Sequence, residues 1–171
     1  LETLLTLPVK RRSIITGKIV GSAAVGMVMA LIYMLAYRFF MSGLNPSPEL
    51  DLAAHGISMG AVDYLILGIS LFLAVLGALA LCLLLGSFAK NYKSAQMLNA
   101  PLIALTMIPM FLTMFTDFDA LPLAGKVITF AIPFSHPMMA SRALLFDQYA
   151  LALSGLAYMA IFTLVVIFIA V

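Results

Sequence analysis

The chain is 171 residues long, and 64% of its residues are hydrophobic while only 9% are charged. A soluble globular domain usually carries about 25% charged residues, so water cannot be the main solvent of this chain. The net charge of +2 gives no support to nucleic-acid binding, which we exclude, because membrane topology explains the basic residues.

The chain opens with a short amphipathic segment, for which we predict a surface-lying helix over residues 1–12. Leu1, Leu4 and Leu5 share one helical face, and Pro8 interrupts the pattern. Physical chemistry alone indicates a helix anchored to anionic lipid by the basic residues that follow the proline. These residues are Lys10, Arg11 and Arg12.

Long uncharged runs predict four membrane-spanning helices in the rest of the chain. Runs of 19, 26 and 23 uncharged residues, and a further run at the C-terminal end, can each cross a hydrocarbon core of about 30 Å at about 1.5 Å per helical residue. We expect Ser13 to cap the first span, and Pro101 and Pro109 to kink the third. The predicted spans are residues 14–41, 64–88, 94–116 and 149–171.

The segment 121–141, between the third and last spans, differs from the spans. Only 15 residues separate Lys126 from Arg142, and several prolines prevent one straight helix. We predict a re-entrant helical hairpin that dips partway into the bilayer, where surrounding protein satisfies its freed backbone groups. At its centre is the sequence Pro133-Phe134-Ser135-His136-Pro137.

The expected fold class is therefore all-α integral membrane, and the charges predict its orientation. Alternate loops must lie on the same side of the membrane. Residues 1–18 and 89–93 carry six Lys or Arg and one acid, whereas residues 38–63 and 117–147 carry three basic residues and six acids. By the positive-inside rule, the N-terminal segment faces the cytoplasm and the acidic loops face outward.

Small residues recur along the first span. Ser22, Gly26 and Ala30 are spaced four residues apart, and Gly17 and Gly21 form a Gly-x-x-x-Gly pair. Such stripes let helix backbones approach closely. Two interpretations remain open at this point: an interface between subunits, or packing within one subunit.

The opening stretch also has a more specific pattern. It resembles the cytoplasmic element of ATP-binding cassette type 2 (ABC-2) permeases, where a Thr-Leu-Glu-like helix, a proline, a basic turn and a Gly-Lys pair entering the next span occur in that order. The order and lengths of the later elements resemble that family's last four spans, the C-terminal two-thirds of such a permease. The matching positions are Leu1, Glu2, Leu4, Leu5, Pro8, Lys10, Arg11, Arg12, Gly17 and Lys18.

The resemblance implies a permease subunit of an ABC transporter, in which two six-span subunits form the pathway. It further implies an exporter in the cell membrane, with ATP and magnesium on a separate ATPase subunit and no cofactor in this chain. Because the sequence begins at Leu1 rather than Met and ends within an apolar run, we expect it to belong to a longer protein. The residues implied to couple to the ATPase subunit are Glu2, Leu4, Leu5, Pro8, Lys10, Arg11 and Arg12.

The hairpin carries the residues that favour an alternative function. An intramembrane enzyme would combine His136 with Asp147 or Asp117 and possibly His55, but such sites usually need more polar groups in one cavity. One imidazole also makes a poor metal site, so we predict no metal. We interpret His136 instead as the polar end of the hairpin at the lipid interface. The hairpin residues of interest are Pro133, Ser135, His136 and Pro137.

The predicted spans lack deeply placed charged residues, which argues against a proton- or sodium-driven carrier. No Gly-rich phosphate loop is present, so ATP hydrolysis cannot be assigned to the chain. Cys82 stands alone in an apolar span and indicates neither a disulfide nor redox chemistry. A passive membrane-anchoring subunit would have the same spans without an ATPase partner. Polar residues that could line a pathway, or bond between helices, are Gln96, Asn99, Thr106 and Thr113.

Overall fold

The computed structural model describes residues 11–43, 59–116 and 118–170. Helices account for nearly all of these residues, and no strand occurs among them, which confirms the all-α class. Residues 1–10 of the predicted surface helix over residues 1–12 lie outside the described residues. The described elements are α2 (Arg11–Gly43), α3 (Ala61–Ser87), α4 (Tyr92–Phe115), η3 (Phe118–Ala120), α5 (Leu123–Ala131), η4 (Pro133–Ser135), α6 (His136–Leu145) and α7 (Tyr149–Ala170).

Four of these helices are long and apolar enough to cross a membrane, which confirms the four predicted spans. Helix α2 is already formed at Arg11, so Ser13 is not the cap of a new helix as we expected. Helix α4 continues through Pro101 and Pro109. The spanning segments are Ser13–Met41, Ala61–Ser87, Tyr92–Phe111 and Tyr149–Ala170.

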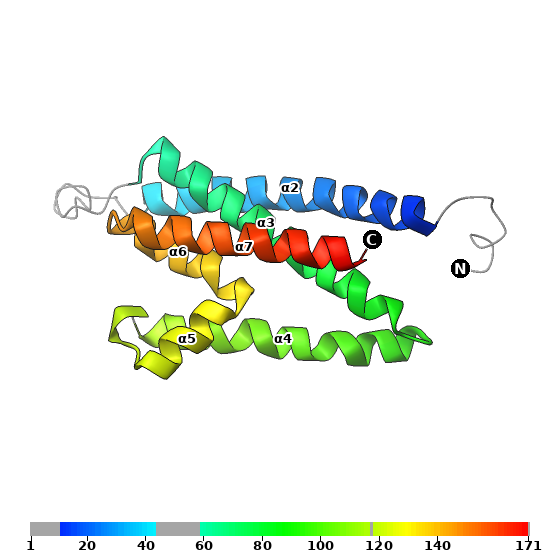
Figure 1. The fold of residues 1–171 in the computed structure, drawn as a ribbon. Coiled ribbons are helices and arrows are strands. Elements are labelled where there is room, and N and C mark those ends of the chain that lie inside the picture. The colour runs from blue at the N-terminus through cyan, green and yellow to red at the C-terminus, as the bar shows by residue number, and fades with distance from the viewer. Residues whose placement is uncertain (1–10, 44–58, 117, 171) are drawn as a thin grey trace.

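The core lies where α7 packs along α3 and where α6 packs against both helices (Figure 1). Small residues make this close approach possible. A Cβ built at Gly77 of α3 would lie 2.9 Å from Oγ1 of Thr163 on α7. The same Thr163 hydroxyl donates a hydrogen bond of 3.3 Å to the backbone carbonyl of Leu73, joining the two helices.

Helix α2 packs on α3 through part of its small-residue stripe. A Cβ at Gly26 would lie 3.1 Å from a methyl group of Val75, and Ala30 is buried. These two residues therefore serve packing within the subunit. A Cβ built at Gly17 or Gly21 would lie within 4 Å of no atom of another described helix, so this packing does not involve them.

The segment before the last span is a pair of short helices. Helix α5 starts at the end of the bundle where α4 ends and runs to the middle, and α6 returns to the same end (Figure 1). With 9 and 10 residues, each is about 14 to 15 Å long and cannot span a bilayer. The chain breaks at Ile132, which is extended, and Pro133 follows it. The pair ends at Leu145 rather than at residue 141.

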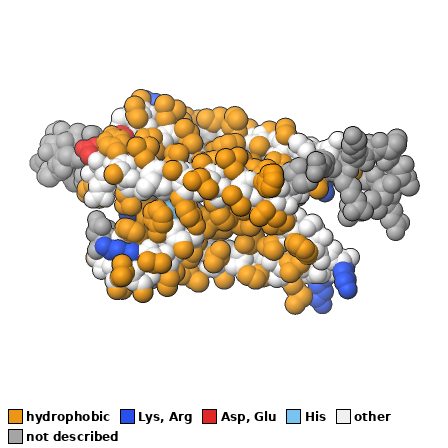
Figure 2. Space-filling view, viewed as in Figure 1, with side chains coloured by type: hydrophobic (Ala, Val, Ile, Leu, Met, Phe, Trp, Pro, Cys, Tyr) orange, Lys and Arg blue, Asp and Glu red, His pale blue; other side chains and the backbone are white. Residues whose placement is uncertain are grey.

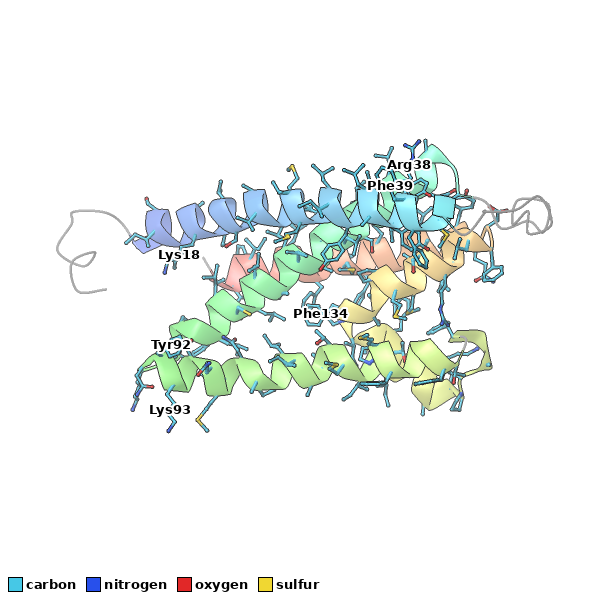
Figure 3. The ribbon with its side chains drawn as sticks, turned by 180° about the vertical axis from the view of Figure 1, so that it is seen from behind. Lys18, Arg38, Phe39, Tyr92, Lys93 and Phe134 are labelled. Atoms are coloured by element: carbon cyan, nitrogen blue, oxygen red, sulfur yellow. The ribbon has the colours of Figure 1, made fainter. Side chains whose placement is uncertain are left out.

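The surface has the distribution expected in a membrane. Hydrophobic side chains cover the middle of the visible face, while charged side chains gather at the two ends (Figure 2). Lys18 and Lys93 lie at one end of the bundle and Arg38 lies at the other (Figure 3). Helices α2 and α4 contribute many exposed apolar side chains, including those of Val28, Phe39 and Ile103.

Candidate functional site

A cavity of about 600 Å³ lies between the helix pair α2–α3 on one side and α4 with the hairpin tip on the other. Its volume is within the range of sites that hold drug-sized ligands. No charged side chain lines it. The lining residues are Tyr33, Tyr37, Leu67, Leu71, Thr106, Met110, Phe134, Ser135, Pro137, Met138 and Ser141.

The small hydroxyl groups of this lining are already used within the protein. Thr106 donates to the carbonyl of Ile103 at 2.7 Å, and Ser141 donates to the carbonyl of Met138 at 2.8 Å. Ser135 Oγ lies 2.5 Å from the Thr129 carbonyl and 2.7 Å from the Ile132 carbonyl. These residues therefore present little unused donor capacity to the cavity.

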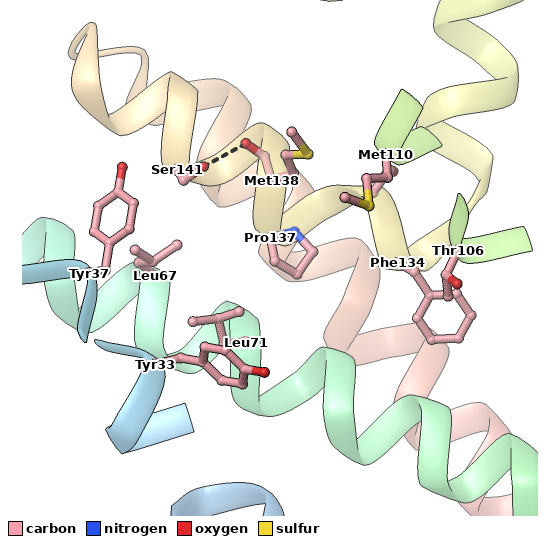
Figure 4. Close-up of a pocket in the computed structure, with 11 residues that line it drawn as sticks. Tyr33, Tyr37, Leu67, Leu71, Thr106, Met110, Phe134, Pro137, Met138 and Ser141 are labelled. Atoms are coloured by element: carbon pink, nitrogen blue, oxygen red, sulfur yellow. Dashed lines mark hydrogen bonds between the residues drawn. The ribbon is translucent and has the colours of Figure 1, made fainter. Parts of the chain in front are cut away.

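Two tyrosines of α2 supply the other hydroxyl groups. Tyr33 and Tyr37 are one helical turn apart, and both line the cavity. Their rings lie on the α2 side, while Phe134 lies on the opposite side near α4 (Figure 4). Tyr37 also packs edge-on against Tyr64 of α3, with ring centroids 6.5 Å apart. The site is thus an apolar, aromatic cavity with tyrosine hydroxyls on one wall.

The opposite face of the hairpin tip holds His136. Its side chain is 1% exposed, and its ring contacts Phe130 at 4.8 Å and Tyr158 at 5.0 Å between centroids. The Tyr158 hydroxyl donates a hydrogen bond of 2.8 Å to the carbonyl of Ala131, which ties α7 to the break in the hairpin. Protein therefore encloses the His136 ring, which does not face lipid as an exposed polar end of the hairpin would.

The polar atoms of this enclosed region are incompletely paired. Among the described residues, neither ring nitrogen of His136 has a hydrogen-bond partner, and neither does Oγ1 of the fully buried Thr129. Burial lowers the pKa of His136, although the nearby Phe130 carbonyl opposes that shift. The imidazole is therefore neutral at pH 7.

The catalytic alternative finds no support in this geometry. Helix α6 has 10 residues, so about 15 Å of helix separates His136 at its start from Asp147, which is exposed beyond its end. Asp117 and His55 lie outside the described residues. Within the described parts of the chain, no three His, Cys, Asp or Glu residues are placed to hold a metal ion.

A buried carboxylate that the sequence analysis did not predict lies at the start of α3. Asp63 is 3% exposed, and one of its oxygens accepts a 2.7 Å hydrogen bond from the backbone nitrogen of Gly60. This contact caps the helix. The other oxygen of Asp63 has no hydrogen-bond partner among the described residues, and Tyr149 at the start of α7 lies near the same carboxylate.

The structure places the residues predicted from the sequence in different parts of the bundle. Ser135 and Pro137 line the cavity, whereas His136 faces α7 and Pro133 is buried at the break. Arg11 and Arg12 belong to α2, and the other predicted coupling residues lie outside the described residues. The lining residues Tyr33 and Tyr37 were missed, although their four-residue spacing on one span is a signal that could have identified them.

The fold and its cavity define a multi-pass helical membrane protein whose spans enclose an uncharged site. The chain belongs to the ABC-2 family of transporter proteins, whose family model matches residues 1–171. It is therefore a membrane component of an ABC transporter system and not a member of a catalytic enzyme family. No curated protein and no solved structure matches the chain.

Proposed function

We propose that the chain is part of the permease subunit of an ABC exporter in the cell membrane, driven by ATP hydrolysis on a separate subunit. The family match over the whole chain is the observation that carries this proposal. In this proposal the substrate site is the cavity between α2, α3, α4 and the hairpin. Its volume of about 600 Å³ and its position among the spanning helices support this assignment. A second permease subunit covers part of the exposed apolar surface of the spans.

The ATPase subunit docks at the end of the bundle that carries Lys18 and Lys93 in this proposal (Figure 3). The excess of basic residues in the segments at this end supports a cytoplasmic location. The coupling segment 1–12 precedes the first span directly, and Arg11 and Arg12 are already part of α2. A force applied to that segment therefore acts on a continuous helix of 33 residues, about 50 Å long.

Helix α2 would pass this movement to the cavity. It packs chiefly on α3, and its remaining surface is largely exposed, so it can shift without disrupting the α3–α6–α7 core. Tyr33 and Tyr37, which form the α2 wall of the cavity, move with it. The hairpin tip lies near the middle of the bundle and forms the facing wall, where it controls outward release in this proposal.

The coupling segment gives a direct test of the proposal. In the full-length protein, we expect Leu4→Ala combined with Leu5→Ala, or Glu2→Lys alone, to detach the ATPase subunit while the protein still inserts into the membrane. Truncating buried apolar anchors at an interface commonly costs about 2 kcal/mol, roughly thirtyfold in affinity. The measurements are co-purification of the two subunits and ATP hydrolysis by the complex.

A basic-for-basic exchange, Lys10→Arg, is the matched control and should leave the complex intact. A lipid anchor depends on total apolar area and charge, whereas a docked helix depends on individual contacts. If the complex and its ATPase activity survive the leucine and glutamate changes while membrane insertion suffers, segment 1–12 is only a lipid anchor and the coupling proposal fails.

A further inference from the structure

The cavity has an unusual balance of polar and apolar groups for a transport site. Sugars, ions and peptides need several hydrogen-bonding or charged partners when they leave water. Here the lining has no charge, and Thr106, Ser135 and Ser141 have already donated their hydroxyl protons to backbone carbonyls. The cavity therefore cannot compensate a strongly hydrated ligand for its lost water.

The remaining polar groups of the lining are the two tyrosine hydroxyls of α2. Tyr33 and Tyr37 lie one turn apart on α2, but their hydroxyls point in different directions: that of Tyr33 points across the cavity toward the side of Phe134, and that of Tyr37 points away from it (Figure 4). A tyrosine hydroxyl can donate and accept one hydrogen bond without carrying charge at neutral pH. One end of a ligand can thus be hydrogen-bonded while the rest contacts apolar groups.

The apolar wall suits a chain of variable shape. Met110 and Met138 are unbranched and flexible, so they can adjust to an irregular ligand. Phe134 and Pro137 add rigid apolar surface at the hairpin tip (Figure 4). Around the cavity, α2 and α4 expose apolar side chains on their outer faces, so the bilayer is the medium from which a ligand would arrive.

We infer that the cavity binds an uncharged amphiphile from the bilayer, with its acyl or similar apolar body against Met110, Phe134 and Met138 and its one neutral polar group on Tyr33. This inference rests on the proposed function only for the direction in which the ligand moves. The ligand class is a neutral lipid-like molecule, in contrast to a free sugar, an inorganic ion or a charged peptide.

The test uses the full-length protein with its ATPase partner in lipid nanodiscs. The probe is a monoacylglycerol with a photoreactive diazirine in its acyl chain, and labelled peptides are identified by mass spectrometry. We expect labelling of the α4 and α6 peptides that carry Met110 and Met138. Thr106→Trp fills the cavity and should reduce this labelling at least severalfold. Tyr33→Phe removes one hydrogen bond and should reduce probe affinity about fivefold.

Ile103→Trp is the matched control for Thr106→Trp. It makes a similar addition of bulk on the same helix, one turn away, at a side chain that is 63% exposed and does not line the cavity. The probe should label the Ile103→Trp protein as strongly as it labels the unchanged protein. Equal labelling of the Thr106→Trp and Ile103→Trp proteins would mean that the probe reports only bilayer lipid around the helices, and the inference would be wrong.

Two further measurements separate this inference from its competitors. A probe with the same acyl chain and a phosphate group should label weakly, and equal labelling by that anionic probe would overturn the neutral class. In a Cys82→Ala background, a cysteine placed at position 106 can be tested for cross-linking to another membrane span. Such a cross-link would show that a helix fills the cavity, and the inference would be wrong. Probe binding without any effect of ATP on it would support the ligand class while contradicting the exporter proposal.

Discussion

The ring of His136 lies directly against Gly155 of α7, so closely that a Cβ built at Gly155 would lie 2.8 Å from Nδ1. This contact holds the start of α6 against the last span. Only a residue without a side chain leaves room for the imidazole there. The position of the hairpin tip, and with it the facing wall of the cavity, therefore depends on a glycine in a different helix.

The first prediction concerns this close contact. We expect Gly155→Ala to lower stability by about 1 to 3 kcal/mol, because overpacking displaces the His136 ring or the backbone of α7. Thermal unfolding of the purified protein in detergent measures the effect. Gly86→Ala is the control, since that glycine is also helical but has nothing within 4 Å of an added Cβ. Equal midpoints for the two variants would show that α7 does not constrain His136.

The second prediction is a pH dependence due to His136, which lies outside the four spanning segments. Its pKa is lowered in the folded protein, so the unfolded chain binds the proton more readily. The stability that depends on the neutral ring is complete above about pH 6.5 and is lost as pH falls below that value toward the folded-state pKa.

This pH effect can be separated from that of the carboxylates with His136→Gln, which removes the titrating group and keeps a polar side chain. We expect Tm to fall more between pH 7.5 and pH 5.5 in the unchanged protein than in the variant. Parallel decreases in both proteins would assign the acid sensitivity to other groups.

The third prediction concerns orientation and uses a background in which Cys82 is replaced by alanine. A cysteine at Ala120, in the turn after α4, should react with an impermeant thiol reagent in intact cells. A cysteine at Asn91, between α3 and α4, should be protected until the membrane is permeabilised, because the positive-inside rule places it in the cytoplasm. Labelling at Asn91 but not at Ala120 would invert the topology.

The fourth prediction tests whether the hairpin enters and leaves the membrane on one side. Lys126 is in α5 and Arg142 is in α6, and both short helices connect to the same end of the bundle. Cysteines at these two positions should therefore share their accessibility from outside. Labelling from opposite sides would mean that the segment crosses the bilayer and that α7 runs in the reverse direction.

Much of the architecture was predictable from local patterns. The uncharged runs identified the four spans because any 20-residue apolar segment must satisfy its backbone hydrogen bonds within itself in a bilayer. The prolines at 133 and 137 marked the break before α6, because a proline cannot donate the helical hydrogen bond. The opening motif indicated the ABC-2 family, and the match over residues 1–171 confirmed it.

The sequence by itself therefore determined the number of spans, the presence of a break before the last span, and the family, since these depend on properties of neighbouring residues. Only the tertiary structure decided which face of each helix is covered. It turned His136 inward against α7, directed Ser135 and Pro137 to the cavity, and placed Tyr33 opposite Phe134. In uniformly apolar helices the hydrophobic pattern does not distinguish lipid from protein, so shape complementarity at small residues such as Gly77 and Gly155 sets the packing.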